Sequence, residues 1–144
     1  MTANQLSIFM ENKPKQLAKV TEILKEMHID IRAMSLADTK DFGIVRMIVS
    51  DCEIAQNVLK EKGFMSTITK VLCIALNDKA GSLSKITELL ADSDINIDYL
   101  YACITVIGKH AYVIMHVDNE IKACEVLIKS GIKLVSDKDL KELA

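Results

Sequence analysis

The feature that most constrains this 144-residue chain is an internal repeat. The segment IFMENKPKQLAKVTEILKEMHIDIRAM, which starts at Ile8, aligns without gaps with IALNDKAGSLSKITELLADSDINIDYL, which starts 66 positions later at Ile74. A repeat of this length indicates that one supersecondary unit is used twice. No Pro-, Gly- or Ser-rich linker separates the copies, because residues 67–76 form one β-prone stretch. We therefore expect two directly joined units, 1–69 and 70–144.

Each copy has the pattern strand, helix, strand, strand, helix, strand. Leu17, Val20 and Leu24 are spaced along one helical face and predict the first helix. Two β-prone runs, 29–37 and 42–49, follow that helix. The second copy repeats this order after its own first strand and helix. We expect the final strands of the two units over residues 64–71 and 132–136.

Local signals also predict where several helices begin and end. Asp51 and Asp118 are placed to act as N-caps for the second helix of each unit. Gly63 and Gly131 stand where a helix C-terminus favours a left-handed residue. Ser136 opens an S-x-x-D sequence that predicts a short terminal helix.

The element order βαββαβ is that of the ferredoxin-like arrangement, which is an α+β fold. Right-handed crossovers then place both helices of a unit on one face of an antiparallel sheet. We expect the apolar residues Val45, Met47 and Val49 on the other face of that sheet. A unit of about seventy residues is marginal alone. We therefore expect the units to pack on each other or on a second copy, as a homodimer.

Composition excludes several classes of protein. Eighteen basic and twenty acidic residues give a net charge of −2, which argues against binding of nucleic acid through phosphate neutralisation. It also argues against a polybasic membrane-surface protein, and the apolar runs are too short to span a bilayer. The N-terminus lacks the charge order of a signal peptide. The four cysteines are spread singly and indicate reduced thiols in a cytoplasmic protein.

One stretch resembles the third strand of RNA-recognition motifs, which share the βαββαβ order. Residues 40–47, KDFGIVRM, overlay the signature of that strand. Its two base-stacking ring positions correspond here to Phe42 and Ile44, and only the first is aromatic. The second copy loses the pattern. RNA binding is therefore a disfavoured alternative.

The usual signatures of metal sites and catalysis are also missing from the sequence. The first strand–helix loops, 11–15 and 77–81, hold no cysteine or histidine to bind a metal. His110 and His116 lie about 20 Å apart if both are on one strand, which is too far for shared ligation. No nucleophile elbow, zinc-protease, phosphate-loop or dinucleotide motif occurs. We predict that the chain is no enzyme and needs no metal or cofactor.

The two strand–helix loops carry a resemblance to a known family. The second loop reads Asn77-Asp78-Lys79-Ala80-Gly81-Ser82-Leu83 and resembles the N-x-P-G-x-L turn of the ACT domain family. The first loop, Glu11-Asn12-Lys13-Pro14-Lys15-Gln16-Leu17, resembles it as well. Asp41–Arg46, DFGIVR, resembles the third strand of the small tandem ACT proteins. Two copies that span nearly the whole chain match the size of those proteins.

The resemblance implies a regulatory module that senses a small molecule, most often an amino acid, at these loops between paired units. Physical chemistry agrees, because a glycine admits a close ligand and a helix N-terminus attracts a carboxylate. Each loop keeps half of the motif, since Lys15 replaces the glycine and Ala80 replaces the proline. The alternative is a structural or protein-interaction module whose loops are turns without ligand. The candidate ligand-binding residues are Asn12, Lys13, Pro14, Asn77, Asp78, Lys79, Ala80, Gly81, Ser82 and Leu83.

Overall fold

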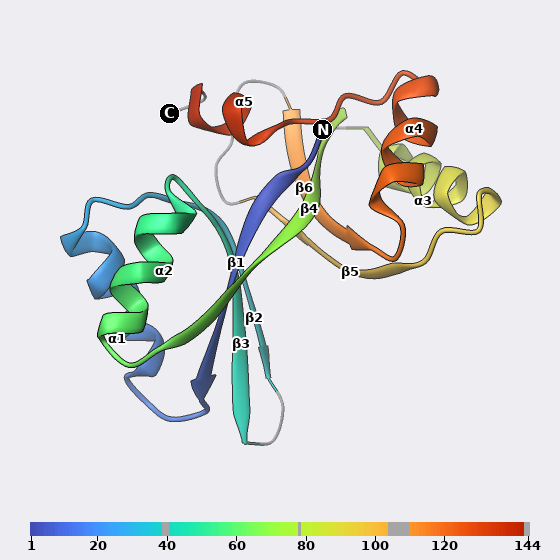
Figure 1. Cartoon of the computed structure of the whole chain (residues 1–144). Coiled ribbons are helices and arrows are strands. Elements are labelled where there is room, and N and C mark those ends of the chain that lie inside the picture. The colour runs from blue at the N-terminus through green and yellow to red at the C-terminus, as the bar shows by residue number, and fades with distance from the viewer. Residues whose placement is uncertain (39–40, 78, 104–109, 143–144) are drawn as a thin grey trace. The chain divides into compact units, whose positions relative to one another are not determined.

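The computed structural model describes residues 1–38, 41–77, 79–103 and 110–142, and of His110 it describes the backbone alone. These residues form a mixed α+β structure that divides into two compact units (Figure 1). The N-terminal unit comprises Asn4–Thr69, and the C-terminal unit comprises Lys70–Ala144 together with Met1–Ala3.

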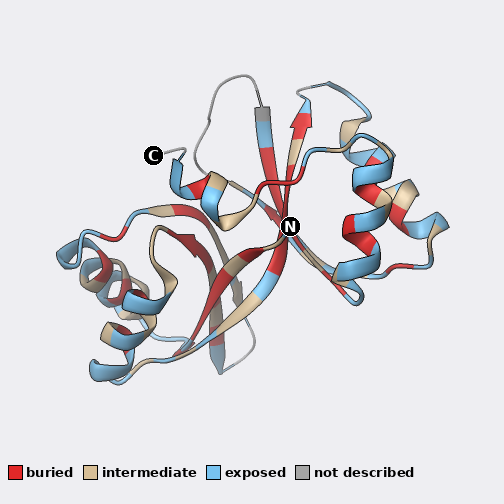
Figure 2. Ribbon diagram, turned by 45° about the horizontal axis from the view of Figure 1, so that its top comes forward, coloured by how far each residue is buried: buried red, intermediate tan, exposed pale blue. Residues whose placement is uncertain are grey.

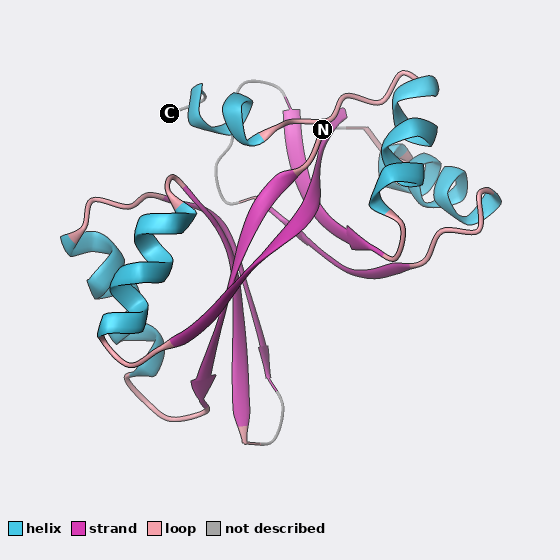
Figure 3. Ribbon diagram, in the orientation of Figure 1, coloured by secondary structure: helices cyan, strands magenta, loops and turns pink. Residues whose placement is uncertain are grey.

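The N-terminal unit has the ferredoxin-like order of strands that the sequence predicts. Its strands lie in the order β2-β3-β1-β4, and β3 is antiparallel to both β1 and β2. Figure 3 shows the strands and the two helices of this unit. The elements are β1 (Ala3–Glu11), α1 (Gln16–Glu26), β2 (Ile31–Asp38), β3 (Phe42–Val49), α2 (Cys52–Glu61) and β4 (Met65–Asn77).

The C-terminal unit starts on the strand that completes the N-terminal one. With 13 residues, β4 is long enough to be the last strand of one unit and the first strand of the next. The strand order here is β4-β6-β5, and β6 is antiparallel to both neighbours. The further elements are α3 (Ser82–Asp92), β5 (Ile97–Ala102), β6 (His110–Val117), α4 (Glu120–Lys129) and α5 (Asp137–Glu142).

The predicted final strand over 132–136 is wrong in extent. The segment makes one isolated antiparallel bridge, between Leu134 and Ile74. Its backbone bonds run from the Ala75 N–H to the Lys133 carbonyl at 3.0 Å and from the Val135 N–H to the Cys73 carbonyl at 2.8 Å. The ladder stops there because the next residue, Ser136, donates its N–H to the side chain of Asp139 just before α5 begins.

Each unit has its own core on the helix side of its strands. In the N-terminal unit, alternate residues of β1 and β3 pack against α1 and α2. Val45, Met47 and Val49 belong to this core, so their predicted place on the opposite face of the sheet is wrong. The strand period of two places alternate residues together, but the sequence does not say which face the helices cover. Val20 and Leu24 of α1 complete this core and are fully buried.

The C-terminal core repeats this arrangement. Leu72, Ile74 and Leu76 of β4 pack against Ile86 and Leu90 of α3. Figure 2 shows the buried residues running along the strands and along the inner faces of the helices. Helices on one face of antiparallel strands, the predicted α+β fold, are therefore confirmed in both units.

The helix ends confirm most of the local predictions. Asp51 caps α2, with its side chain accepting from the Ile54 N–H at 3.0 Å. Gly63 and Gly131 follow α2 and α4 with φ of 87° and 75°. The prediction of Asp118 as the cap of α4 is wrong. The cap is Asn119, because the Asp118 carboxylate instead accepts from the Asn96 backbone N–H at 3.0 Å.

Candidate functional site

The first strand–helix loop is a compact turn between β1 and α1, closed by its own backbone (Figure 1). The Lys13 N–H donates to the Glu11 carbonyl at 2.8 Å, and the Gln16 N–H donates to the Lys13 carbonyl at 3.4 Å. Asn12 ties the loop to the neighbouring strands. Its backbone N–H donates to the Asp41 carbonyl at 3.2 Å, and its Nδ2 donates to the Asp38 carboxylate at 3.0 Å.

The second strand–helix loop repeats this geometry 66 positions later. The Lys79 N–H donates to the Asn77 carbonyl at 2.8 Å, and the Ser82 N–H donates to the Lys79 carbonyl at 3.3 Å. The first helical bonds also correspond. They run from Lys19 to the Lys15 carbonyl and from Lys85 to the Gly81 carbonyl, both at 3.0 Å. The described backbone of the two loops therefore makes the same hydrogen bonds in two different sequences.

The N-cap of each helix has a left-handed backbone. Lys15 has a φ of 73° and Gly81 a φ of 89°. Glycine adopts this conformation without steric cost, whereas in lysine the Cβ then lies too close to the following carbonyl oxygen. A Cβ built on Gly81 would meet no heavy atom of the described residues within 4 Å. The space in front of the α3 N-terminus is therefore open on the side where a side chain would project.

Both helix N-termini lack the negative charge that usually balances them. Within the described residues, the Lys15 side chain makes no bond to its helix, Gly81 has no side chain, and neither first turn contains an acidic residue. The first N–H groups of a helix have no acceptor inside the helix, and the helix dipole favours an anion there. Such an end can hold a carboxylate.

An ion pair modifies the charge of the first loop. Lys13 Nζ lies 2.6 Å from Glu11 Oε2, and both side chains are more than half exposed. The hydrogen bond between them, and then their mutual Coulomb attraction, lower the pKa of Glu11 and raise the pKa of Lys13. Solvent screens an exposed pair of this kind, so it adds little to the stability of the fold.

The predicted site residues fall into two groups, one in each unit. Those of the first loop lie together on the surface of the N-terminal unit, and the described residues of the second lie together in the C-terminal unit. Leu83 is 38% exposed although it is apolar, and Ser82 is half-buried. Asp78 lies outside the described residues. The exposed members are Asn12, Lys13, Pro14, Asn77, Lys79, Ala80, Gly81 and Leu83.

A cavity of about 490 Å³ adjoins the first loop and was missed from the sequence. Its charged lining residues are Glu11, Lys19 and Lys62. The chain has three phenylalanines, and all of them line this cavity. No local sequence motif predicts it, because its residues come from the end of β1, the first turn of α1, the start of β3, and the turn before β4 with the start of that strand. The apolar lining residues are Phe9, Met10, Phe42, Phe64 and Met65.

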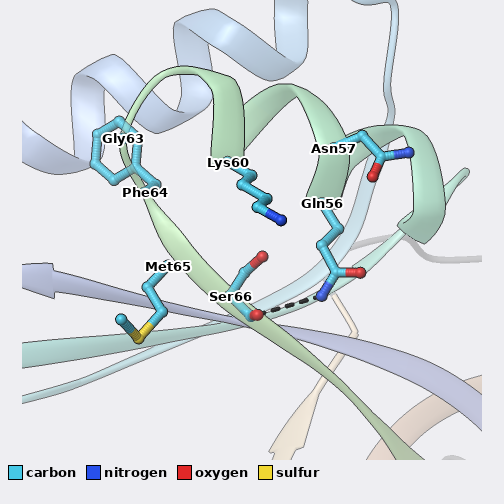
Figure 4. Close-up of a pocket in the computed structure, with 7 residues that line it drawn as sticks. All are labelled: Gln56, Asn57, Lys60, Gly63, Phe64, Met65 and Ser66. Atoms are coloured by element: carbon cyan, nitrogen blue, oxygen red, sulfur yellow. Dashed lines mark hydrogen bonds between the residues drawn. The ribbon is translucent and has the colours of Figure 1, made fainter.

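Two further cavities of the N-terminal unit share residues with this one. A cavity of about 530 Å³ lies between α2 and the start of β4 (Figure 4). Gln56 and Lys60 extend from α2 toward that strand, and Gln56 Nε2 donates to the Ser66 carbonyl at 3.2 Å. The Ser66 hydroxyl is buried and has no hydrogen-bond partner among the described residues. The third cavity, of about 250 Å³, is lined in part by Lys19, Lys62 and Phe64.

Other groups with chemical potential lie outside the loops. In the C-terminal unit, His116 Nδ1 lies 2.8 Å from Asp98 Oδ2, and the His116 ring stacks on Tyr99 with centroids 5.1 Å apart. All four cysteines are free thiols. A hydrogen bond with Cys103, and then burial, raise the pKa of the Cys73 thiol, which keeps it protonated and unreactive.

Two global features of the described residues bear on function. No group of three or more His, Cys, Asp or Glu side chains within them is placed to hold a metal ion. Within the same part of the chain, the helices are all too short or too polar to cross a bilayer.

Comparison with known proteins gives one family. A family model described as an ACT domain pair matches residues 1–144. The crystal structure of protein BT0572 from Bacteroides thetaiotaomicron is 37% identical, with a TM-score of 0.91, and the match covers 98% of this chain and 96% of that one. No match was found among curated proteins.

More distant structures share the fold. The regulatory subunit of aspartate kinase from Thermus thermophilus is 17% identical with a TM-score of 0.59, over 88% of this chain and 91% of that one. The corresponding subunit from Thermus flavus is 14% identical with a TM-score of 0.58, over 88% and 90%. At these identities the likeness concerns the fold alone.

Proposed function

This chain belongs to the ACT domain family, and on that premise we propose that it is a regulatory module that binds an amino acid and has no catalytic activity. An ACT domain pair is a regulatory module for small molecules. The regulatory subunits of aspartate kinase share its fold, and the resemblance of its two loops to the ACT turn implies an amino acid as the ligand. We propose that its ACT units are 1–69 and 70–144.

The observation that carries the proposal is the repeated loop geometry. In both copies a left-handed residue, Lys15 or Gly81, precedes a helix whose first turn contains no acidic residue. An α-carboxylate suits such a helix N-terminus. Amide and hydroxyl groups beside it can hydrogen-bond the remaining polar atoms of an amino acid. We propose as ligand-binding residues Asn12, Lys13, Pro14, Asn77, Asp78, Lys79, Ala80, Gly81, Ser82 and Leu83.

A thermal-shift panel of the twenty amino acids tests the function. A ligand at one hundred times its Kd stabilises the folded chain by about 2.7 kcal/mol. For a chain of this size each kcal/mol corresponds to roughly 2–4 °C in Tm, so a true ligand gives a clear shift. A panel in which every amino acid leaves Tm unchanged favours the alternative, a structural or protein-interaction module.

Two loop variants then locate binding by calorimetric titration. Gly81→Asp places a carboxylate against the carboxylate of the ligand, and Lys15→Asp does the same at the first loop. Gly81→Asn is the matched control, because Asn has the same shape without the charge and tolerates a left-handed backbone. We expect each Asp variant to weaken binding at its own loop, and the Asn variant to weaken it much less. Unchanged binding in both Asp variants would place the site elsewhere.

We also propose that the chain forms a homodimer. The support is the family, whose domains often oligomerise. Val45, Met47 and Val49 were expected to face a partner, but they are buried in the core of their own unit and therefore give no support to a dimer. Light scattering tests this proposal. A homodimer should have twice the mass of one chain, and a mass of 16.0 kDa at all concentrations would show that the protein is a monomer.

A further inference from the structure

The cavity beside the first loop has a wall that is unusual for this chain. Aromatic residues make up 4% of the sequence, which contains no tryptophan, yet all three phenylalanines line this one cavity. Phe42 is 59% exposed, Phe9 is 37% exposed and Met65 is 73% exposed. Exposed apolar groups gathered around a cavity mark a binding site more often than scattered ones do.

The charges around that wall complement a zwitterion. Lys19 and Lys62 line both this cavity and the adjoining smaller one, so two cationic side chains belong to both. Glu11 supplies a carboxylate at the same wall. Its ion pair with Lys13 engages one oxygen at 2.6 Å, and a carboxylate has about four acceptor positions. An amino acid therefore finds cations for its carboxylate and an acceptor for its ammonium group.

The size and the apolar wall select among amino acids. A cavity of about 490 Å³ falls within the range of roughly 300–1,000 Å³ that is usual for small-molecule sites. A polar side chain facing five apolar ones would lose its hydrogen bonds to water without replacement. An aromatic or large aliphatic side chain would instead cover the exposed rings.

Resting on the proposed function, we propose that the first-loop ligand is an amino acid with an aromatic or large aliphatic side chain. Its side chain is held between Phe9, Phe42 and Met65, and its carboxylate lies at the α1 N-terminus, where Lys19 and Lys62 add positive charge. The ligand class thus follows from the cavity wall and not from the loop. The neighbouring cavity shares Phe64 and Met65 with this one, whereas its residue Lys60 does not line the proposed site and supplies a control (Figure 4).

Methionine methyl NMR locates the ligand directly on the full-length chain. Met10 lines this cavity and not the neighbouring one, Met65 lines both, and Met115 is fully buried in the C-terminal core. Titration with phenylalanine and with leucine should shift the Met10 and Met65 methyl signals and leave Met115 in place. Serine, aspartate and lysine should shift neither. Binding of those polar amino acids in preference to the apolar ones would overturn the ligand class but leave the proposed function standing.

Two matched pairs of variants test the wall. Phe42→Ser should raise the Kd of phenylalanine about tenfold. Leu36→Ser, at an apolar residue of similar exposure (55%) that does not line the cavity, should leave it unchanged. Lys62→Ala should weaken binding, and Lys60→Ala, at the neighbouring cavity, should not.

The outcomes separate the two proposals. If apolar amino acids bind but Phe42→Ser and Leu36→Ser behave alike, the cavity assignment is wrong and loop binding survives. If Gly81→Asp alone abolishes binding of apolar amino acids, the ligand sits at the second loop and the assignment is again wrong. If no amino acid binds, the proposed function fails as well.

Discussion

Lys15 and Gly81 occupy the same place in the two copies at different conformational cost. Both have a left-handed backbone, with φ of 73° and 89°. The left-handed conformation costs an ordinary residue about 1–2 kcal/mol, and strain of this kind is often kept at binding sites. His28 and Asp94 form a second such pair, with φ of 54° and 57° at the C-terminal ends of α1 and α3.

The residue scale gives the first prediction, which concerns the free energy of unfolding. Lys15→Gly should stabilise the chain by about 0.5–1 kcal/mol, because relief of the left-handed strain outweighs the extra flexibility of glycine when unfolded. Gly81→Ala should destabilise it by about 1 kcal/mol. No described atom lies within 4 Å of the new Cβ, so strain alone acts. Urea denaturation measures both changes.

Lys13→Gly is the control for the first change. Lys13 lies in the same loop but is not among the residues with a positive φ, so glycine there adds flexibility without relieving strain and should lower stability. If Lys15→Gly also lowers stability, the left-handed backbone at that residue is not strained.

Part of the loop geometry could be predicted from the sequence. Gly81 was expected to allow a close approach at its turn, and its positive φ is consistent with that expectation. A lysine gives no comparable signal, so the left-handed backbone of Lys15 follows only from its alignment with Gly81 in the repeat. The wall of Phe9, Phe42 and Phe64 has no signal at all along the chain, because three separate elements must first come together.

At the scale of elements, the helix caps give the second prediction. Asp51 caps α2 and Asn119 caps α4, each through one side-chain bond to a first-turn N–H. Replacing either by alanine should cost about 1 kcal/mol of unfolding free energy. Asn119→Ser should keep most of the stability of α4, because serine caps almost as well. An alanine variant as stable as the parent in urea would show that the cap contributes nothing.

The third prediction concerns the pH dependence of α5. The Asp139 carboxylate accepts from the Ser136 N–H at 2.9 Å and from its hydroxyl at 2.8 Å. These bonds, with weaker attraction from Lys133 and Lys138, hold the pKa of Asp139 below its ordinary value. The capping interaction is therefore complete above the unfolded pKa of about 3.9 and is lost as the pH falls through the folded pKa.

Carboxyl NMR titration from neutral to acid pH measures this pKa directly. Ser136→Ala should move the Asp139 midpoint upward, because both the hydroxyl bond and the local order of the cap are lost. Ser136→Thr keeps the hydroxyl and should leave the midpoint close to that of the parent. A midpoint that does not respond to Ser136→Ala would show that the capping box does not exist in solution.

The helices and strands also show which features the sequence patterns could predict and which they could not. The helices and the order of strands follow from apolar spacing and from the repeat. The cap of α4 was predicted at Asp118 and not at Asn119 because an Asp beside an Asn leaves two candidates. The contact with Asn96, which decides between them, comes from a distant part of the chain. The strand predicted over 132–136 is a single bridge for a similar reason. The Ser136 N–H donates to the Asp139 carboxylate and is therefore not available to extend the strand pairing.

At the scale of the whole molecule, two separate cores share one strand. Among the described residues, the N-terminal core and the C-terminal core have no buried residue in common. Strand β4 nevertheless runs from Met65 to Asn77 through the boundary between Thr69 and Lys70. A repeat joined in this way has no linker that lets one copy unfold without disturbing a strand of the other. The domain bounds that we propose therefore predict two cores that are distinct but coupled.

Leu24 and Leu90 test that coupling, because they are equivalent in the repeat and both are fully buried. Leu24→Ala and Leu90→Ala should each cost about 2–5 kcal/mol. Hydrogen exchange should speed up within the N-terminal unit for the first variant and within the C-terminal unit for the second. Peptides from β4 should respond to both, since the strand contributes to both units. Faster exchange over the whole chain in either variant would instead mean that it unfolds as one cooperative unit.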